Sequence, residues 1–337
     1  MRPLVLVDAD VLGRRRTGDE TYVRELLRAL PHVAGDLRLA AVTRRPELVP
    51  AGVEPVEVRT RVQELRMALR LPLLLRRLRP ALVHFVHALP PALRCPGVLT
   101  VQDLSFERDA SLMGRRETAI FRAVVPWSVR RAARVLAISQ RTKDDLVALY
   151  GLPEEKVIVT PLAPDPAFSP GDGGHDGYLL VAGAVEPRKN PLAAAAAAQE
   201  LGMKLVSAGP ERDAGLAAEL RARGVDVRGF VSQAELVELY RRAACLVFPT
   251  RYEGFGLPVA EAMATGTPVV AAPDAAVREV GGDAIAYAEP ERLAEALRNV
   301  LAERERWSRA ALERAKLFSW DETARRTAQV YREVLGL

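Results

Sequence analysis

The 337-residue sequence is poor in the residues that build disulfides, metal sites and stacking surfaces. It has two cysteines and four histidines, and aromatic residues make up 5% of it. Cys95 and Cys245 lie far apart in apolar surroundings, so we expect two free thiols in a reducing cytoplasm and no disulfide. No cluster of histidine, cysteine and carboxylate has metal-ligand spacing. Because no basic stripe is interleaved with aromatic rings, we expect no nucleic acid partner.

The sequence also lacks the long apolar runs and glycine motifs of several large protein classes. No apolar stretch approaches the roughly 20 residues of a membrane span, and we expect no signal peptide, since Met1 leads directly into a strand pattern. No G-x-G-x-x-G follows that strand and no glycine-rich lysine loop is present, which argues against a dinucleotide oxidoreductase and a P-loop NTPase. The net charge of +5 suits anionic substrates or anionic lipid.

What the sequence does contain is a regular alternation of apolar strand patterns and helical patterns. The predicted strands are 3–8, 38–43, 81–86, 97–102, 134–138, 156–160, 178–183, 204–208, 225–228, 245–249, 268–272 and 284–287. The predicted helices are 19–30, 62–79, 115–133, 140–150, 191–201, 213–223, 233–243, 258–265 and 291–303, with a helical tail. Such alternation indicates parallel sheets that are covered on both faces.

The chain is long enough for two domains. The segment 165–177 is rich in proline, glycine and aspartate and predicts a linker. We therefore expect an α/β protein with two doubly wound, Rossmann-like domains, 1–164 and 178–318. In such folds ligands bind outside the carboxyl ends of the strands, here in an interdomain cleft.

The strongest functional signal lies between residues 245 and 272, CLVFPTRYEGFGLPVAEAMATGTPVVAA. It reads as a buried strand, a glycine loop, and a helix that Pro258 can open and Gly266 can end. The free N–H groups and the dipole of such a helix favour an anion at its start. Glu253 and Glu261 frame the loop, and carboxylates accept hydrogen bonds from sugar hydroxyls. The combination suits a nucleotide-sugar; an ordinary strand–loop–helix of a Rossmann-like domain is the alternative.

This segment resembles the donor-site signature of retaining glycosyltransferases with the GT-B fold, a family that includes sucrose synthase-like and mannosyltransferase-like enzymes. The signature is two glutamates, eight positions apart, around Glu-Gly-Phe-Gly. The resemblance covers most of the chain and is strongest from 134 to 320. It implies metal-independent transfer of a sugar from a nucleoside-diphosphate-sugar to a hydroxyl acceptor, such as a glycan or glycolipid. It also implies that the final helix, 319–337, packs on the first domain.

The segment VAGAVEPRKNP places Arg188 and Lys189 at a predicted helix entrance, with Asn190 as the expected cap. These cations would neutralise the leaving diphosphate, because negative charge builds on its oxygen as the glycosidic bond breaks. By the resemblance, Glu253 holds sugar hydroxyls and Glu261 binds the ribose. The expected backbone contacts to the donor come from Gly254, Phe255, Gly256, Leu257, Gly209, Pro210, Phe230, Val231 and Gly18.

Three residues depart from the family pattern. Ala184 stands where many relatives have an arginine, and we expect Arg188 to replace that arginine. Gln102 stands where many relatives have a histidine; its amide can bind a hydroxyl but cannot carry a proton at neutral pH. Asp103 could orient Gln102 or cap its loop, and it is also a candidate for acceptor binding. Gly18 begins the first loop and helix, but Glu20 replaces a second glycine, so we expect Glu20 to meet the acceptor or an arginine.

Two histidines lie at a predicted strand, VHFVHALPP. His84 alternates with apolar residues, which indicates a structural role. His87 opens the following loop, so it is a candidate for acceptor binding.

Residues 61–79, RVQELRMALRLPLLLRRLR, are apolar and arginine-rich. They could lie on an anionic membrane, or they could form an ordinary helix that covers a sheet. Two other functions also fit the sequence. One is a non-catalytic sugar-nucleotide-binding subunit of a polysaccharide assembly complex, and the other is a nucleotide-sugar epimerase.

Overall fold

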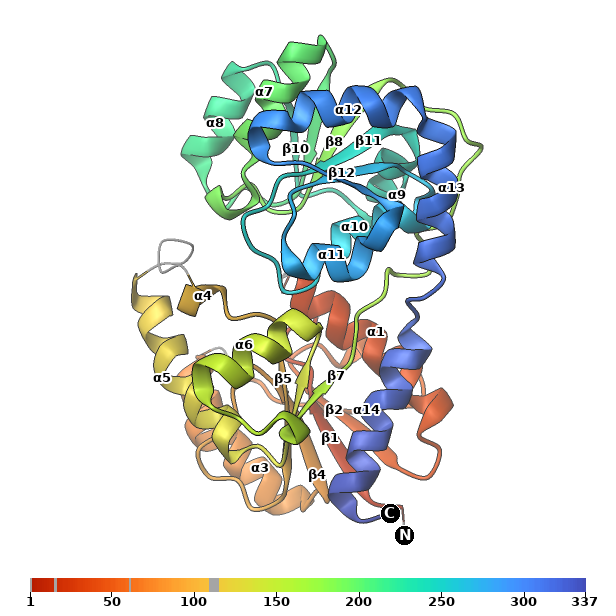
Figure 1. Cartoon of the computed structure of the whole chain (residues 1–337). Coiled ribbons are helices and arrows are strands. Elements are labelled where there is room, and N and C mark those ends of the chain that lie inside the picture. Colours follow the sequence, from red (N-terminus) through yellow and green to blue (C-terminus); the bar gives the residue numbers. More distant parts are fainter. Residues whose placement is uncertain (1, 15–16, 61, 109–114) are drawn as a thin grey trace. The chain divides into compact units, whose positions relative to one another are not determined.

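The computed structural model describes residues 2–14, 17–60, 62–108 and 115–337 (Figure 1). The chain divides into two compact units. The first is Met1–Leu162 together with Ser319–Leu337, and the second is Ala163–Phe318. Each unit consists of one parallel sheet with helices on both faces.

Seven parallel strands form the sheet of the first unit, in the order β3-β2-β1-β4-β5-β6-β7. They are β1 (Leu4–Asp8), β2 (Arg38–Thr43), β3 (Glu54–Glu57), β4 (Leu82–Val86), β5 (Gly97–Val101), β6 (Arg134–Ala137) and β7 (Val157–Val159). The chain runs from β1 to β2 on one side and returns to β4 on the other. The strand order therefore reverses beside β1, which is where doubly wound sheets bind ligands.

The helices of the first unit divide between the two faces of its sheet. They are α1 (Thr17–Val33), α2 (Gln63–Leu65), α3 (Leu71–Leu78), α4 (Ser105–Arg108), α5 (Arg115–Arg131), α6 (Gln140–Tyr150) and α14 (Trp320–Leu335). Helices α3, α5 and α6 pack on one apolar core through Leu71, Val125 and Leu146. Helices α1 and α14 contact each other and cover the other face (Figure 1).

A buried chain of hydrogen bonds fastens α1 and α14 to the sheet. The Nδ1 of His84 lies 2.6 Å from the hydroxyl of Tyr331, and its Nε2 lies 2.7 Å from the Oγ1 of Thr100. The hydroxyl of Tyr22 lies 2.7 Å from the same Oγ1. Burial lowers the pKa of His84 to about 3, so the ring is neutral at pH 7. This agrees with the structural role predicted for His84.

Six parallel strands form the sheet of the second unit, in the order β10-β9-β8-β11-β12-β13. They are β8 (Tyr178–Ala182), β9 (Leu205–Ala208), β10 (Asp226–Gly229), β11 (Ala243–Phe248), β12 (Val269–Ala271) and β13 (Ala286–Tyr287). Its helices are α7 (Pro191–Leu201), α8 (Ala214–Ala222), α9 (Gln233–Arg242), α10 (Leu257–Thr265), α11 (Ala275–Gly281), α12 (Leu293–Ala302) and α13 (Arg304–Ala315). Here the order reverses between β8 and β11.

Several elements differ from the prediction. Strand β3 was missed because it contains Pro55 and two glutamates, a composition that only an edge strand tolerates. Helix α13 was missed because Ala311 is its only buried residue, so the segment has no apolar stripe. Helices α4 and α11 were also missed. The predicted single helix 62–79 is interrupted by a π-helical turn, Arg66–Arg70, and its neighbour Arg61 lies outside the described residues.

Candidate active site

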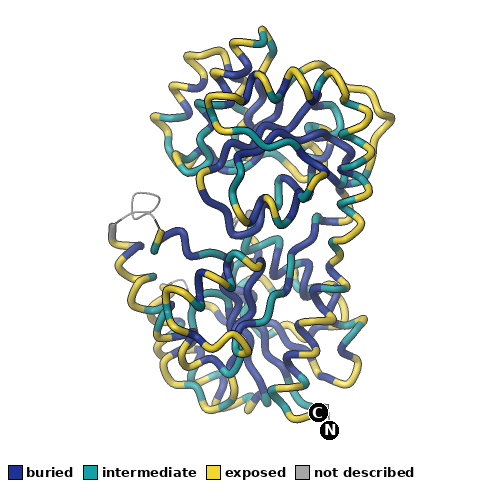
Figure 2. The backbone as a smooth tube through the Cα atoms, in the orientation of Figure 1, coloured by how far each residue is buried: buried dark blue, intermediate teal, exposed yellow. Residues whose placement is uncertain are grey.

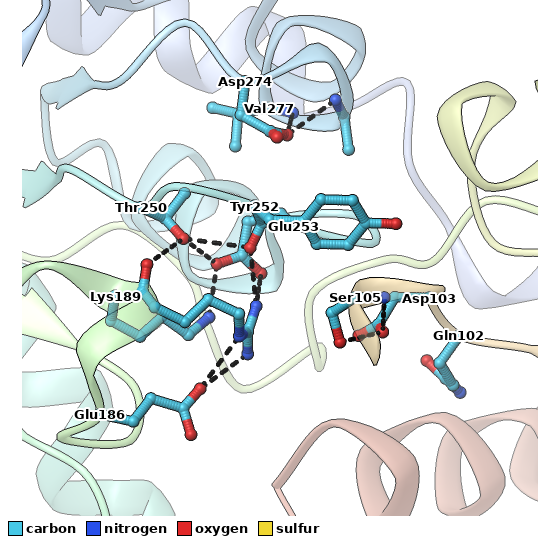
Figure 3. Close-up of polar contacts among 12 residues, drawn as sticks. Gln102, Asp103, Ser105, Glu186, Lys189, Thr250, Tyr252, Glu253, Asp274 and Val277 are labelled. Atoms are coloured by element: carbon cyan, nitrogen blue, oxygen red, sulfur yellow. Dashed lines mark hydrogen bonds and ion pairs between the residues drawn. The ribbon is translucent and has the colours of Figure 1, made fainter. Parts of the chain in front are cut away.

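The loops that follow β8 and β11 bring three predicted site residues together in the second unit (Figure 3). The Nζ of Lys189 lies 2.6 Å from the Oε1 of Glu253, and a guanidinium nitrogen of Arg188 lies 3.4 Å from its Oε2. The three side chains are largely buried, with exposed fractions of 16% for Arg188, 11% for Lys189 and 8% for Glu253. The sequence placed these residues in one site, and the structure puts them in contact.

Neighbouring polar groups hold this cluster in place. The Oγ1 of Thr250 donates to the Oε1 of Glu253 at 2.7 Å. Arg188 donates to the backbone oxygen of Tyr252 at 2.7 Å and through two nitrogens to the Oε1 of Glu186. These partners were not predicted, because only the folded loops bring them within hydrogen-bond distance.

Burial and neighbouring charges shift the pKa values of the cluster in opposite directions. Burial tends to raise the pKa of Glu253, but the charges of Lys189 and Arg188 and the hydrogen bonds from Lys189 and Thr250 outweigh it and lower the pKa. Burial lowers the pKa of Lys189, and the charge of Glu253 partly offsets this effect. Glu253 is therefore a carboxylate at neutral pH, and its charge is balanced within the protein.

The glycine loop 253–256 leads directly into α10. Gly256 has φ +101°, a backbone conformation that side chains with a Cβ rarely adopt, and Pro258 lies in the first turn. Phe255 is 3% exposed and its ring packs edge-on against Phe318, so any contact from Phe255 to a ligand would come from its backbone. Together with Leu257, these residues form a helix N-terminus that suits an anion.

Glu261 lies in α10, and its carboxylate is held from the neighbouring helix. The hydroxyl of Tyr240 in α9 donates to its Oε2 at 2.8 Å. Burial and the adjacent Glu261 raise the pKa of Tyr240 well above its ordinary value, so the hydroxyl keeps its proton and remains a donor. Tyr240 was not predicted as part of the site.

The loops predicted to hold the base are hydrogen-bonded to one another at the strand ends. The backbone N–H of Gly209 donates to the oxygen of Gly229 at 2.8 Å, and that of Val185 to the oxygen of Pro210 at 2.9 Å. A Cβ on Gly209 would lie 2.0 Å from the oxygen of Gly183, so only glycine fits there. Phe230 is 49% exposed and precedes Val231 at the start of the next loop.

Asn190 does not act as the predicted cap of α7. Its backbone is left-handed, with φ 50°, and its side chain makes no capping hydrogen bond to the described residues. Asparagine tolerates this conformation better than most residues, which explains its presence before Pro191. A cavity of about 510 Å³ opens here, lined by Asn190, Thr250, Arg251, Asp274 and Glu289 among others.

In the first unit, Gln102 and Asp103 follow β5. Gln102 is 7% exposed, and its Nε2 has no hydrogen-bond partner among the residues that the structure describes. Asp103 accepts from the backbone N–H and the hydroxyl of Ser105, at 2.9 and 2.7 Å (Figure 3). Asp103 therefore caps the turn into α4, the second of its two predicted roles.

The other candidates of the first unit lie around the start of α1. The Nε2 of His87 lies 3.3 Å from the Oδ1 of Asp19, and His87 has a left-handed backbone with φ 64°. Glu20 accepts from the backbone N–H of Gly13 at 2.8 Å. A Cβ on Gly18 would have no neighbour within 4 Å, which leaves open space beside this residue.

Among the described residues, no group of three or more histidine, cysteine, aspartate or glutamate side chains could hold a metal ion. Asp8 ends β1 and Asp10 lies two residues beyond it, and both are paired with arginines. Arg66 contacts Asp8, and the Nε of Arg44 lies 2.9 Å from the Oδ1 of Asp10.

Two parallel-sheet units with ligand loops at their strand ends define a protein of the GT-B class. Family models match both: "Glycosyl transferases group 1" over residues 176–303 and "Glycosyltransferase Family 4" over residues 16–168. The D-inositol 3-phosphate glycosyltransferase 1 of Catenulispora acidiphila is 32% identical over 71% of this chain and 67% of its own length. The chain belongs to the group 1 and family 4 glycosyltransferases.

A second relative is similar in sequence, and three solved structures share the fold. The O-antigen chain mannosyltransferase B of Escherichia coli is 29% identical over 61% of this chain, and the aligned part is 62% of that protein. Sucrose-phosphate synthase of Thermosynechococcus elongatus has a TM-score of 0.80 at 17% identity over all of both chains. A glycosyltransferase of Rickettsia africae shares the fold with a TM-score of 0.73, at 14% identity over 99% of each chain. Anabaena Alr3699/HepE, solved with UDP and glucose, has a TM-score of 0.72 at 14% identity, over 98% of this chain and 100% of its own.

Proposed function

We propose that this protein transfers a sugar from a nucleoside-diphosphate-sugar to a hydroxyl acceptor with retention of configuration. The observation that carries the proposal is the buried cluster of Arg188, Lys189 and Glu253 beside the start of α10. Membership of the glycosyltransferase family supports it. So does the fold shared with a protein that was solved with UDP and glucose.

In this proposal the cations and amides of the cluster stabilise the leaving diphosphate. The β-phosphate oxygen gains negative charge as the glycosidic bond breaks, and fixed donors that already point at it lower the barrier. Lys189 is now paired with Glu253. An arriving diphosphate would share this cation, and the freed lone pairs of Glu253 would then accept from hydroxyls of the sugar.

The ribose would lie against Glu261. Tyr240 donates to the Oε2 of this carboxylate and so helps to fix its orientation; the carboxylate would accept from ribose hydroxyls. The base would rest on the loops at Gly209-Pro210 and Phe230-Val231. These contacts would come largely from backbone atoms.

Gln102 would contribute a hydrogen bond from the first unit. A buried amide without a partner is costly, about 1–3 kcal/mol, so a ligand oxygen that accepts from its Nε2 would be bound favourably. Because the Gln102 amide cannot act as a base at neutral pH, we assign the acceptor's proton to the departing phosphate oxygen, on the same face of the sugar. No metal is required in this scheme.

The acceptor would be a glycan, a glycolipid or a small glycoside, and we propose no nucleic acid partner. Cys95 and Cys245 are both free thiols, which supports the cytoplasm as the compartment. Glu20, His87 and Asp103 are the proposed acceptor-side residues, and Gly18 is a proposed contact to the donor. Gly18 has room beside it.

The test is a thermal-shift panel of UDP, GDP, ADP and dTDP and their sugars, followed by assays of nucleotide release with glycan and glycolipid acceptors. A ligand at 100 times its dissociation constant adds about 2.7 kcal/mol of stability, which such a scan detects. Release of nucleotide that depends on an acceptor is the expected result. If no nucleotide or nucleotide-sugar shifts the transition, the proposal is wrong.

One observation favours a second candidate, a non-catalytic sugar-nucleotide-binding subunit. Glu20 stands where the resembled family often has a second glycine, and it accepts from the backbone N–H of Gly13. Binding without turnover in the presence of acceptors would support this candidate. Conversion of the sugar without any acceptor would instead indicate an epimerase.

A further inference from the structure

The helical stretch from Val62 to Leu78 in the first unit has apolar side chains on both its inner and its outer side. On the inner side Leu71 and Leu75 are buried in the core that also contains Phe85. On the outer side four aliphatic side chains face solvent: Val62 is 55% exposed, Leu65 44%, Leu69 49% and Leu73 52%. A single exposed leucine is ordinary, but a contiguous exposed group marks an interaction surface.

Arg66 fixes which side of this stretch faces outward. Its side chain is fully buried and contacts the carboxylate of Asp8, and its Nε lies 3.7 Å from the Oδ1 of Asp10. Leu65, Leu69 and Leu73 are each four positions apart, which places them along one side of the helical stretch. Rotation of the helix to bury these leucines would pull Arg66 from its partners, so the exposed apolar side is built into the fold.

The same stretch carries positive charge that is not neutralised within the protein. Arg70, Arg76, Arg77 and Arg79 are exposed, and none of their side chains forms an ion pair or hydrogen bond with another described residue. Glu64 is the only acidic residue between 62 and 79. Most other arginines of the described chain are paired with carboxylates, as Arg38 is with Glu54.

Helix α5 adds residues of the same kind on the same face of the sheet. Ile120 is 46% exposed and Trp127 38%, and Arg131 lies over the Trp127 ring at 4.9 Å. Because α3 and α5 pack on one core, they cover the same face, and both are exposed on their outer sides (Figure 2). In the parts of the chain that the structure describes, no helix is both long enough and apolar enough to cross a membrane.

We infer that this face docks on the surface of an anionic lipid bilayer. We call it the lipid-facing surface and define it by Val62, Leu65, Leu69, Leu73, Arg70, Arg76 and Arg77. Its leucines would enter the boundary between headgroups and acyl chains, and its arginines would pair with lipid phosphates, as in other interfacial helices. Charge and apolar surface together favour a lipid bilayer over other partners. A second copy of this positively charged face would repel the first, and a nucleic acid would leave the leucines in water. The inference goes beyond the proposed sugar transfer and needs no substrate.

The experiment is co-sedimentation of the protein with vesicles of phosphatidylcholine alone or mixed with phosphatidylglycerol. The expected result is binding to the mixed vesicles, little to the neutral ones, and loss of binding as salt is raised. Replacing Arg70, Arg76 and Arg77 by glutamine should weaken binding about a hundredfold, from about fivefold for each arginine. The variant with Leu65→Ser, Leu69→Ser and Leu73→Ser should lose at least about tenfold.

Leu317→Ser is the matched control, because Leu317 is 65% exposed but belongs to the second unit; it should bind like the wild type. Circular dichroism and the nucleotide thermal shift show whether each variant remains folded. The inference is overturned if the wild type does not co-sediment with anionic vesicles, or if the leucine variant binds them as tightly as the wild type does. It is also overturned if a duplex oligonucleotide at matched charge concentration is bound more tightly than the vesicles. None of these results bears on sugar transfer.

Discussion

The Nζ of Lys189 lies 2.6 Å from the Oε1 of Glu253, and both side chains are buried at the strand ends of the second unit. A buried pair of this kind stabilises the fold little in net terms, but the loss of one partner leaves an uncompensated charge. The same contact holds the cation that we assign to the diphosphate. Stability and ligand binding are therefore coupled at this pair, and substitutions can separate them.

Lys189→Met should lower the free energy of unfolding by about 3 kcal/mol, because Glu253 loses its main counter-charge. The double variant Lys189→Met, Glu253→Gln should regain much of that loss, since no lone charge remains. Both variants should bind a nucleoside diphosphate more than about tenfold more weakly, which is about 1.4 kcal/mol. Denaturant titration measures the first effect and titration calorimetry the second. Unchanged affinity in the double variant would remove Lys189 from the donor site.

Thr250 should position Glu253 for the sugar and leave the diphosphate unaffected. Thr250→Val keeps the shape but removes the 2.7 Å hydrogen bond to the Oε1 of Glu253. A hydrogen bond to a charged group contributes about 1.5–3 kcal/mol, so affinity for the nucleotide-sugar should fall about tenfold or more. Affinity for the free nucleoside diphosphate should change little. Thr250→Ser is the control and should restore binding; equal losses for both ligands would contradict the positioning role.

Glu261 should be the residue that distinguishes ribose from deoxyribose. Glu261→Ala should weaken binding of a nucleoside diphosphate by more than about tenfold, as expected when a charged hydrogen-bond acceptor is removed. The preference for ribose over the 2′-deoxy analogue should vanish in the same variant. Tyr240→Phe removes the hydroxyl that holds the Oε2 of Glu261 and should show a smaller loss in the same direction. A ribose preference that survives Glu261→Ala would refute this assignment.

His84 should make the protein less stable in mild acid. Its pKa is about 3 in the folded state because of burial, against about 6.5 in the unfolded chain. The unfolded state therefore binds more protons between these values, so stability falls as pH drops through 6.5 toward 3. Between pH 7 and pH 5 this group alone should cost about 2 kcal/mol. Denaturant titrations at the two pH values measure the effect.

His84→Gln should flatten this part of the pH dependence. The comparison variant is His175→Gln, because His175 is exposed in the glycine-rich segment before β8 and should leave the wild-type dependence intact. If His84→Gln and the wild type lose stability in parallel from pH 7 to pH 5, another group is responsible.

Much of the architecture could be predicted, because strands that are buried on both faces appear as apolar runs. Strand β5 is an example, with all five of its residues buried. Edge and surface elements gave no such signal. The ends of β3 are glutamates and its second residue is Pro55, and α13 has no apolar stripe. The π-helical turn at Arg66–Arg70 could not be predicted either, because a partner 58 positions away, Asp8, holds Arg66 inside.

The candidate site was predictable only in part. Arg188, Lys189 and Glu253 stood out because unusual charges follow apolar strands and border a glycine loop. Their supporting residues did not stand out, since threonine and tyrosine are common everywhere. Thr250 and Tyr240 gain their role from distances that the folded loops and the packing of α9 on α10 create.

The last helix completes a structure that the first part of the chain begins. Residues of α14 supply Tyr331 to the buried hydrogen bonds of His84, and Arg332 bonds to Asp36 beyond the end of α1. A ribosome makes the whole second unit before it makes these residues. The first unit must therefore wait for its closing helix with Tyr22 and His84 uncovered, while the second unit can fold as it emerges. We therefore expect the first unit to complete its folding last, when α14 packs on it. A fragment that stops before α14 should be prone to aggregation.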